Sequence, residues 1–145
     1  MTPPAAPVLP DGYRYTPYYC EENIYLLAAS FQLDSSTVQA WEISVVFVSN
    51  GSKSVALWNQ KLCAGPEHPV IWDYHVILAL RPRRATGDDI GDIAWVYDFD
   101  SNLAPIPQPW HDYLYATFGG ELTQRSLPEQ YRRCTIKSLC HRVCP

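Results

Sequence analysis

The stretch VIWDYHVILAL at residues 70–80 has the strongest strand pattern of the chain and carries a histidine near its middle. Side chains two positions apart share one face of a strand. One face would therefore present Ile71, Asp73, His75 and Ile77, and the other Trp72, Tyr74, Val76 and Leu78. The stretch predicts a strand with a histidine and an aspartate on the same side.

A second strand is expected at residues 93–100, beyond a polar loop at residues 81–92 that contains Pro82 and Gly87. By the same alternation, one of its faces carries Ala94, Val96, Asp98 and Asp100, and the other carries Trp95, Tyr97 and Phe99. This strand therefore predicts two aspartates on one face.

The two strands can form a hairpin that brings the histidine to an aspartate. If Leu80 pairs with Ile93, His75 lies directly opposite Asp98. Directly opposed residues on one face have Cβ atoms about 5 Å apart, so the carboxylate could hold the imidazole. A shift of one residue would break this pairing.

The remaining periodic segments predict an α+β domain. Apolar residues at helical spacing from Cys20 to Phe31 indicate an amphipathic helix. Further elements are expected as strands at 42–48 and 54–59, a turn at 49–52, a loop at 63–69 and a short helix at 110–118. Residues 1–12 contain four prolines and predict a flexible lead-in. One helix followed by a mainly antiparallel sheet is an α+β arrangement.

The composition is typical of a single globular domain. Of 145 residues, 47% are hydrophobic and 18% are charged, which argues against disorder. The net charge is −4 and the eleven basic residues are scattered, so nucleic acid is not an expected partner. No apolar run reaches membrane-spanning length and the first residues lack a secretory pattern. We expect a soluble intracellular protein.

Cys20 is the candidate nucleophile. Five cysteines without a secretory signal are expected to be free thiols. A thiol attacks as its thiolate, whose formation is helped by a helix N-terminus and by a nearby imidazole. Glu21 and Glu22 would oppose the first effect. The chemistry therefore requires His75 as well.

The predicted roles are those of a Cys-His-Asp triad. His75 would take the thiol proton and later return it to the leaving group, while Asp98 would fix its tautomer. Asp73 and Asp100 are rival partners for the histidine. Each residue also has a simpler interpretation: Cys20 as a small buried residue, His75 as a hydrogen-bonded core histidine, and the aspartates as caps of a turn.

Metal binding is the competing use of cysteine and histidine. Cys63 and His68 are close in sequence, and Cys134, Cys140, His141 and Cys144 gather near the end. None of these spacings is one that structural zinc sites commonly use, and we predict no metal and no cofactor.

Three segments resemble the protein N-terminal glutamine amidohydrolases: YCEENI at 19–24, VIWDYHV at 70–76 and YDFD at 97–100. VFVSN at 46–50 and YRR at 131–133 also fit, and the resemblance covers residues 13–133. It implies a monomeric, cofactor-free enzyme of cytosol and nucleus with a papain/transglutaminase-like α/β sandwich. Such an enzyme deamidates an N-terminal glutamine to glutamate, which feeds arginylation and the N-degron pathway. The family's catalytic residues fall on Cys20, His75 and Asp98.

The resemblance leaves the substrate contacts open. The backbone N–H of Cys20 is one expected donor to the oxyanion, and residues 13–19 offer no glutamine as a second. Glu22 and Asp73 flank the proposed catalytic residues and are candidates to bind the substrate α-ammonium group.

The end of the chain departs from the family. Residues 134–145 read CTIKSLCHRVCP, where family members continue for several dozen residues. We expect a catalytic domain at 13–133 and an atypical tail after it. Alternative functions are a cysteine peptidase or transglutaminase-like acyl transferase, or an inactive module that binds N-terminal residues.

Overall fold

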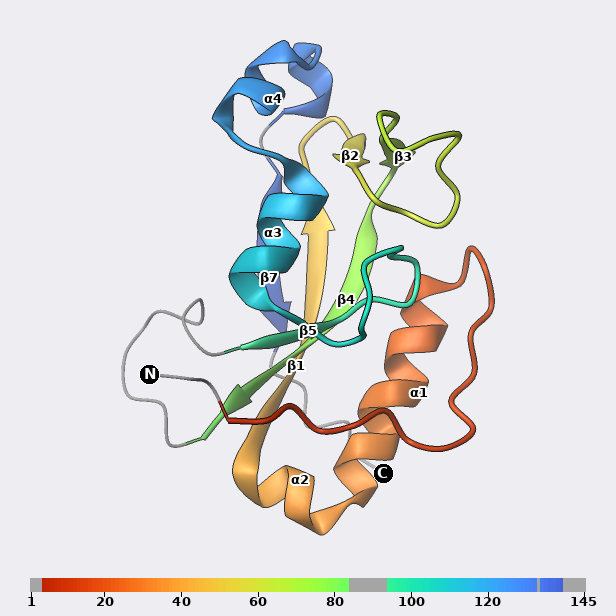
Figure 1. Ribbon diagram of the computed structural model, residues 1–145, viewed down its shortest axis with the longest axis vertical. Helices are drawn as coiled ribbons and strands as arrows, with labels where there is room; N and C mark the ends of the chain where they lie inside the picture. Colours follow the sequence, from red (N-terminus) through yellow and green to blue (C-terminus); the bar gives the residue numbers. More distant parts are fainter. Residues whose placement is uncertain (1–3, 84–93, 133, 140–145) are drawn as a thin grey trace.

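A five-stranded antiparallel sheet forms the centre of the molecule (Figure 1). The computed structural model describes residues 4–83, 94–132 and 134–139. The strand order is β6-β5-β4-β1-β7, and a small second sheet pairs β2 with β3. The strands are β1 Trp41–Ser49, β2 Val55–Leu57, β3 Val70–Trp72, β4 His75–Pro82, β5 Trp95–Tyr97, β6 Gln108–Pro109 and β7 Thr135–Leu139. The prediction of an α+β fold with a mainly antiparallel sheet is confirmed.

Helices cover both faces of the large sheet. They are α1 Cys20–Leu33, α2 Ser35–Ala40, α3 Trp110–Phe118 and α4 Glu121–Ser126, with a 3₁₀ turn at Glu129–Tyr131. Ile24, Leu27 and Phe31 of α1 pack against one face, and Tyr113 of α3 packs against Ile77 on the other. No helix in the described part of the chain is both long and apolar enough to cross a bilayer.

The helix predicted at residues 20–31 is α1, and its buried side follows from its sequence. Ile24, Leu27, Ala28 and Phe31 recur at spacings of three and four, so they lie on one face and are buried. Burying a Leu, Ile or Phe side chain contributes roughly 2 kcal/mol each, which is enough to dock the helix on the sheet. This docking holds the first turn, and Cys20 with it, at one end of β4.

The stretch 70–80 is not one strand, as we predicted, but two. It breaks after Trp72, so β3 joins the small sheet while β4 begins at His75 in the large one. At the break, the Asp73 carboxylate accepts the backbone N–H of Tyr74 at 3.0 Å. An aspartate that binds a neighbouring backbone N–H competes with strand pairing, which explains the interruption. The break makes His75 the first residue of a central strand.

The predicted register of the hairpin is also wrong. Leu80 pairs with Trp95 and Leu78 with Tyr97, a shift of two residues from the expected pairing with Ile93, which lies outside the described residues. Because the shift is even, each residue keeps its expected face of the sheet. β5 ends at Tyr97, so Asp98 comes from the turn that follows the strand.

The N-terminal segment runs in an extended conformation across the lower part of the large sheet toward α1 (Figure 1). The Trp95 indole N–H donates to the Pro4 carbonyl at 3.1 Å, and the Tyr97 hydroxyl donates to the Pro7 carbonyl. Further along, the ring of Tyr13 stacks on Phe99 with centroids 4.9 Å apart. The proline-rich pattern of residues 1–12 gives no sign of these contacts, which depend on partners about 90 positions away.

Candidate active site

Cys20 is the first residue of α1 and is only 7% exposed. Because Cys20 is the first residue of the helix, its backbone N–H has no acceptor within the helix. The chain reaches it through a tight turn, in which the Tyr19 N–H donates to the Thr16 carbonyl at 3.3 Å. Asn23 fixes this turn from one helical turn away: its side chain accepts the Thr16 N–H at 2.9 Å and donates to the Thr16 carbonyl at 2.8 Å. These hydrogen bonds hold in place the backbone that carries the Cys20 side chain.

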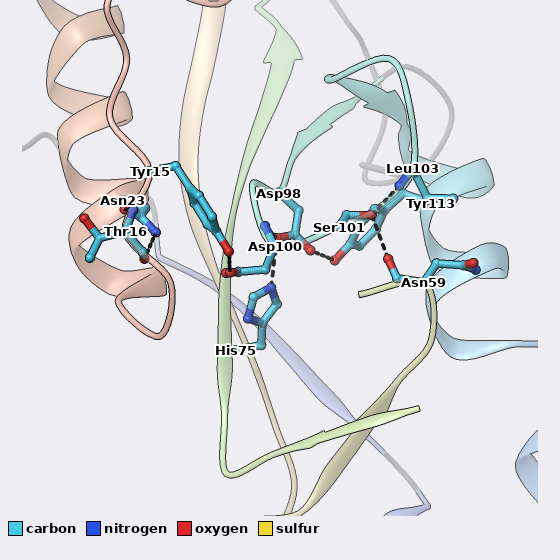
Figure 2. Close-up of polar contacts among 10 residues, drawn as sticks. All are labelled: Tyr15, Thr16, Asn23, Asn59, His75, Asp98, Asp100, Ser101, Leu103 and Tyr113. Atoms are coloured by element: carbon cyan, nitrogen blue, oxygen red, sulfur yellow. Dashed lines mark hydrogen bonds and ion pairs between the residues drawn. The ribbon is translucent and has the colours of Figure 1, made fainter. Parts of the chain in front are cut away.

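His75 and Asp98 form a buried pair. The histidine is 0% exposed and the aspartate 3%, and 3.0 Å separates His75 Nε2 from Asp98 Oδ1 (Figure 2). Within the described residues His75 Nδ1 is buried without a hydrogen-bond partner. With Nε2 held by the carboxylate, Nδ1 is the nitrogen that can exchange a proton with a thiol.

Asp98 is held by three donors. Oδ1 accepts from His75 and from the backbone N–H of Asp100 at 3.0 Å, and Oδ2 accepts from the Tyr113 hydroxyl at 2.7 Å. A fully buried carboxylate is costly unless its oxygens are satisfied in this way. The contacts fix both the position and the orientation of the side chain.

The two groups stabilise each other's charge. Burial alone would lower the pKa of His75, but the charge and hydrogen bond of Asp98, with a smaller effect of Cys20, raise the pKa above its ordinary value. Burial alone would raise the pKa of Asp98, but His75, Tyr113 and the Asp100 N–H lower it. Cys20 is among the groups that raise the pKa of His75, and its helix α1 packs against β4, which begins at His75. The arrangement therefore favours an imidazolium–carboxylate pair beside a cysteine.

The rival aspartates make different contacts. Asp100 is buried, and its Oδ1 accepts the Tyr15 hydroxyl at 2.8 Å (Figure 2). Burial and the charge of Asp98 raise the pKa of Asp100, against the hydrogen bond from Tyr15. Asp73 is exposed and binds the Tyr74 N–H. Of the three carboxylates, Asp98 is the one that hydrogen-bonds His75.

A metal ion could in principle use the same group. One ligand atom from each of His75, Asp98 and Asp100 lies within 4.8 Å of the others, and all three residues are buried. However, the His75 nitrogen already binds Asp98, and both aspartates accept hydrogen bonds from tyrosine hydroxyls. A metal would have to displace these donors, so the geometry fits a hydrogen-bonded site better. No other such group, including one with Cys63 and His68, occurs among residues 4–83, 94–132 and 134–139.

Comparison with known proteins matches residues 15–138 to the family described as N-terminal glutamine amidase. The chain belongs to this family. The protein N-terminal glutamine amidohydrolase of Arabidopsis thaliana is 38% identical over 115 residues, which cover 77% of this chain and 49% of the relative. The Drosophila mojavensis protein of the same name is 36% identical over 118 residues, 81% of this chain and 52% of the relative. The chain thus spans about half the length of the curated relatives it matches.

Within this amidase-family chain, the two predicted substrate carboxylates lie in different settings. Both Glu22 and Asp73 are exposed. Residues two apart on a helix do not face each other, so Glu22 points away from the side of α1 that carries Cys20. Asp73 lies at the break just before His75. The geometry favours Asp73 over Glu22 as a group near the site.

Three aromatic residues of the site were missed by sequence reasoning. Tyr113 and Tyr15 hold the two buried aspartates, and the ring of Trp72 stacks on His75 with centroids 5.3 Å apart. The helical spacing of Tyr113 and Thr117 could have indicated that both are buried on one face. It could not have shown that the partner is Asp98, because that contact joins different elements.

Proposed function

We propose that Cys20, His75 and Asp98 are the catalytic triad of a protein N-terminal glutamine amidohydrolase, which converts an N-terminal glutamine to glutamate and releases ammonia. One observation carries the proposal: a buried His75–Asp98 pair, 3.0 Å apart, leaves Nδ1, among the described residues, without a hydrogen-bond partner at the start of β4, the strand against which α1, beginning at Cys20, packs. All three residues lie within the segment that matches the family.

In the first half of the reaction the enzyme is acylated. His75 Nδ1 carries the proton that Cys20 has given up, so the resting pair is a thiolate beside an imidazolium, and the thiolate attacks the substrate Cδ to form the C–S bond. The backbone N–H of Cys20 donates to the oxyanion, a contact that is typically worth about 3 kcal/mol in such sites. The C–N bond then breaks, and the imidazolium gives its proton to the departing nitrogen, which leaves as ammonia.

In the second half water regenerates the thiolate. His75 Nδ1 takes a proton from water, the hydroxide oxygen attacks the thioester carbon, and the C–S bond breaks. The proton stays on His75, which restores the resting pair, and the product is glutamate. Asp98 stays ionised throughout and holds the imidazole by Nε2. The steps use three side chains, the backbone N–H of Cys20 and one water molecule.

Further parts of the proposal follow from the family resemblance. Residues 13–133 would form a catalytic domain related to papain-like and transglutaminase enzymes, acting as a monomer in cytosol and nucleus. The glutamate product would be a substrate for arginylation in the N-degron pathway.

The first experiment measures ammonia release from a short peptide with a free N-terminal glutamine. Cys20→Ala should abolish release, whereas Cys63→Ala, a matched change at a half-exposed cysteine outside the triad, should leave it intact. An N-acetylated peptide should not react. Turnover of an internal glutamine with an added amine would instead indicate an acyl transferase. Peptide binding by the folded chain without ammonia release would indicate a binding module and reject the enzyme.

Asp73 should contribute to binding of the substrate ammonium group. Asp73→Ala is expected to raise KM for the peptide about ten-fold with little change in kcat, because the lost interaction is present before and during the reaction. Glu22→Ala, on the other side of α1, is the matched control and should leave KM unchanged. Steady-state kinetics with equal effects at both positions would reject the assignment.

A further inference from the structure

Asp98 lies between His75 and a tyrosine that no catalytic step has used (Figure 2). Tyr113 of α3 is 1% exposed, and its hydroxyl is 2.7 Å from Asp98 Oδ2, the oxygen that His75 does not use. We propose that Tyr113 is a positioning residue, which fixes the Asp98 carboxylate so that Oδ1 keeps hold of His75 Nε2 and Nδ1 stays available to Cys20. This inference rests on the proposed function.

The ring of Tyr113 is held where its hydroxyl can do this. It packs in the core between α3 and the sheet, against Val46, Ile77, Ala79 and Val96. Interiors are packed as densely as organic crystals, so the ring has little freedom to move. The hydroxyl is therefore a fixed donor to the carboxylate.

Removal of this donor would loosen the carboxylate. Oδ2 would lose its hydrogen bond, and the terminal torsion of aspartate is intrinsically broad, so orientation would depend on the contacts of Oδ1 alone. A buried carboxylate oxygen without a partner also disfavours the ionised form. Both effects weaken the hold on His75 Nε2, and the correct tautomer of the imidazole becomes less populated.

The hydroxyl stays protonated under working conditions. Burial and the negative charge of Asp98 raise the pKa of Tyr113 well above its ordinary value. Tyr113 is thus a donor at every pH at which the triad would operate, and it exchanges no proton with the substrate. Its effect is expected on the histidine, through Asp98.

The test compares two buried tyrosines that each lose one hydrogen bond. Tyr113→Phe should lower kcat for the N-terminal glutamine peptide about ten-fold and leave KM unchanged, because the substrate does not touch this residue. Tyr97→Phe removes a hydroxyl that binds the Pro7 carbonyl, so it should lower stability but not kcat. Thermal unfolding of both variants shows whether they are folded to the same extent.

A second readout needs no amidase activity. Alkylation of Cys20 by iodoacetamide, followed by peptide mass spectrometry, is measured at about pH 6, where an ordinary thiol with a pKa of about 8.5 is almost fully protonated. The rate should be highest in wild type, lower in Tyr113→Phe and lowest in His75→Ala. In an Asp98→Asn background, Tyr113→Phe should change this rate less than about two-fold, because residues that act as a unit are not additive.

The outcomes separate this inference from the proposed function. If wild type releases no ammonia, the proposed function fails, but the alkylation rates still decide the role of Tyr113. Equal losses of kcat in Tyr113→Phe and Tyr97→Phe, or an undiminished effect of Tyr113→Phe on alkylation in the Asp98→Asn background, overturn the inference.

If Tyr113→Phe does not fold, 3-fluorotyrosine is placed at 113 and, as a control, at 97. A change in the Cys20 alkylation rate only at position 113 supports the inference, and no change at either position overturns it.

Discussion

Asn23 shows how a single buried polar side chain fixes the backbone just before Cys20. It is 2% exposed in a helix whose buried face is otherwise apolar. Both ends of its amide bind the backbone of Thr16, at 2.9 and 2.8 Å. These two bonds offset the cost of burying the amide and join the turn before Cys20 to the helix after it. Asn23 therefore determines the direction from which the chain enters α1.

Asn23→Ala should destabilise the protein and impair the site. The Thr16 N–H would lose its partner and the Thr16 carbonyl would keep only the Tyr19 N–H, which is expected to cost about 2 kcal/mol of unfolding free energy in urea titration. Because the turn before Cys20 would loosen, kcat should fall as well. Ser30→Ala is the matched control: its exposed hydroxyl donates to the Leu26 carbonyl of the same helix, and its loss should cost less than about 0.5 kcal/mol. Comparable losses in the two variants would contradict the role of Asn23.

At the level of elements, α3 connects the site to the rest of the sheet. It carries Tyr113 inward and ends at Gly119, whose φ of 73° lies in the left-handed region. A side chain at this position would also collide with α4, since a Cβ would come within 2.8 Å of Thr123 Cγ2 and 2.9 Å of its Cβ. The glycine thus allows α3 to stop and α4 to begin within two residues.

Gly119→Ala should lower the free energy of unfolding by about 2 kcal/mol, from backbone strain and from the clash with Thr123. The neighbouring Gly120 gives a matched control. Its φ is −82°, and a Cβ there would have Tyr115 Cε2 as its nearest heavy atom at 3.7 Å, an ordinary contact. Gly120→Ala should change stability by less than about 0.5 kcal/mol. Chemical denaturation that ranks the two variants in the opposite order would show that Gly119 is not constrained.

At the level of the whole molecule, the His75–Asp98 pair couples stability to pH. Folding raises the pKa of His75, so its stabilising contribution is complete below about pH 6.5, the pKa of an unfolded histidine, and is lost as pH rises through the folded value. Folding lowers the pKa of Asp98, so its contribution is present above about pH 3.9 and is lost as pH falls through the folded value. The pair therefore stabilises the fold most between these limits.

The unfolding free energy should fall by up to about 1.4 kcal/mol per pH unit above about pH 6.5 because of His75. Urea denaturation at several pH values measures this slope. His75→Gln keeps a donor for Asp98 but does not titrate, so the difference between wild type and variant should shrink as the pH rises. A difference that is constant with pH would mean that folding does not raise the pKa of His75.

Local pattern was enough for two of the helices, α1 and α3, and for the faces of the strands, whereas α2 and α4 were not predicted. The spacing of apolar residues identified α1 and α3, and strand alternation separated Ile77 and Val96 from Leu78 and Tyr97 even though the assumed register was two residues off. These features depend on neighbours within a few positions. Asp98 reaches His75 from the turn after β5, which alternation did not predict. The division of residues 70–80 between two sheets and the true register depend on pairing between strands. The contact of Tyr113 with Asp98 depends on how a helix docks on the opposite face of the sheet. Such contacts join residues through space, and only the tertiary structure brings them together.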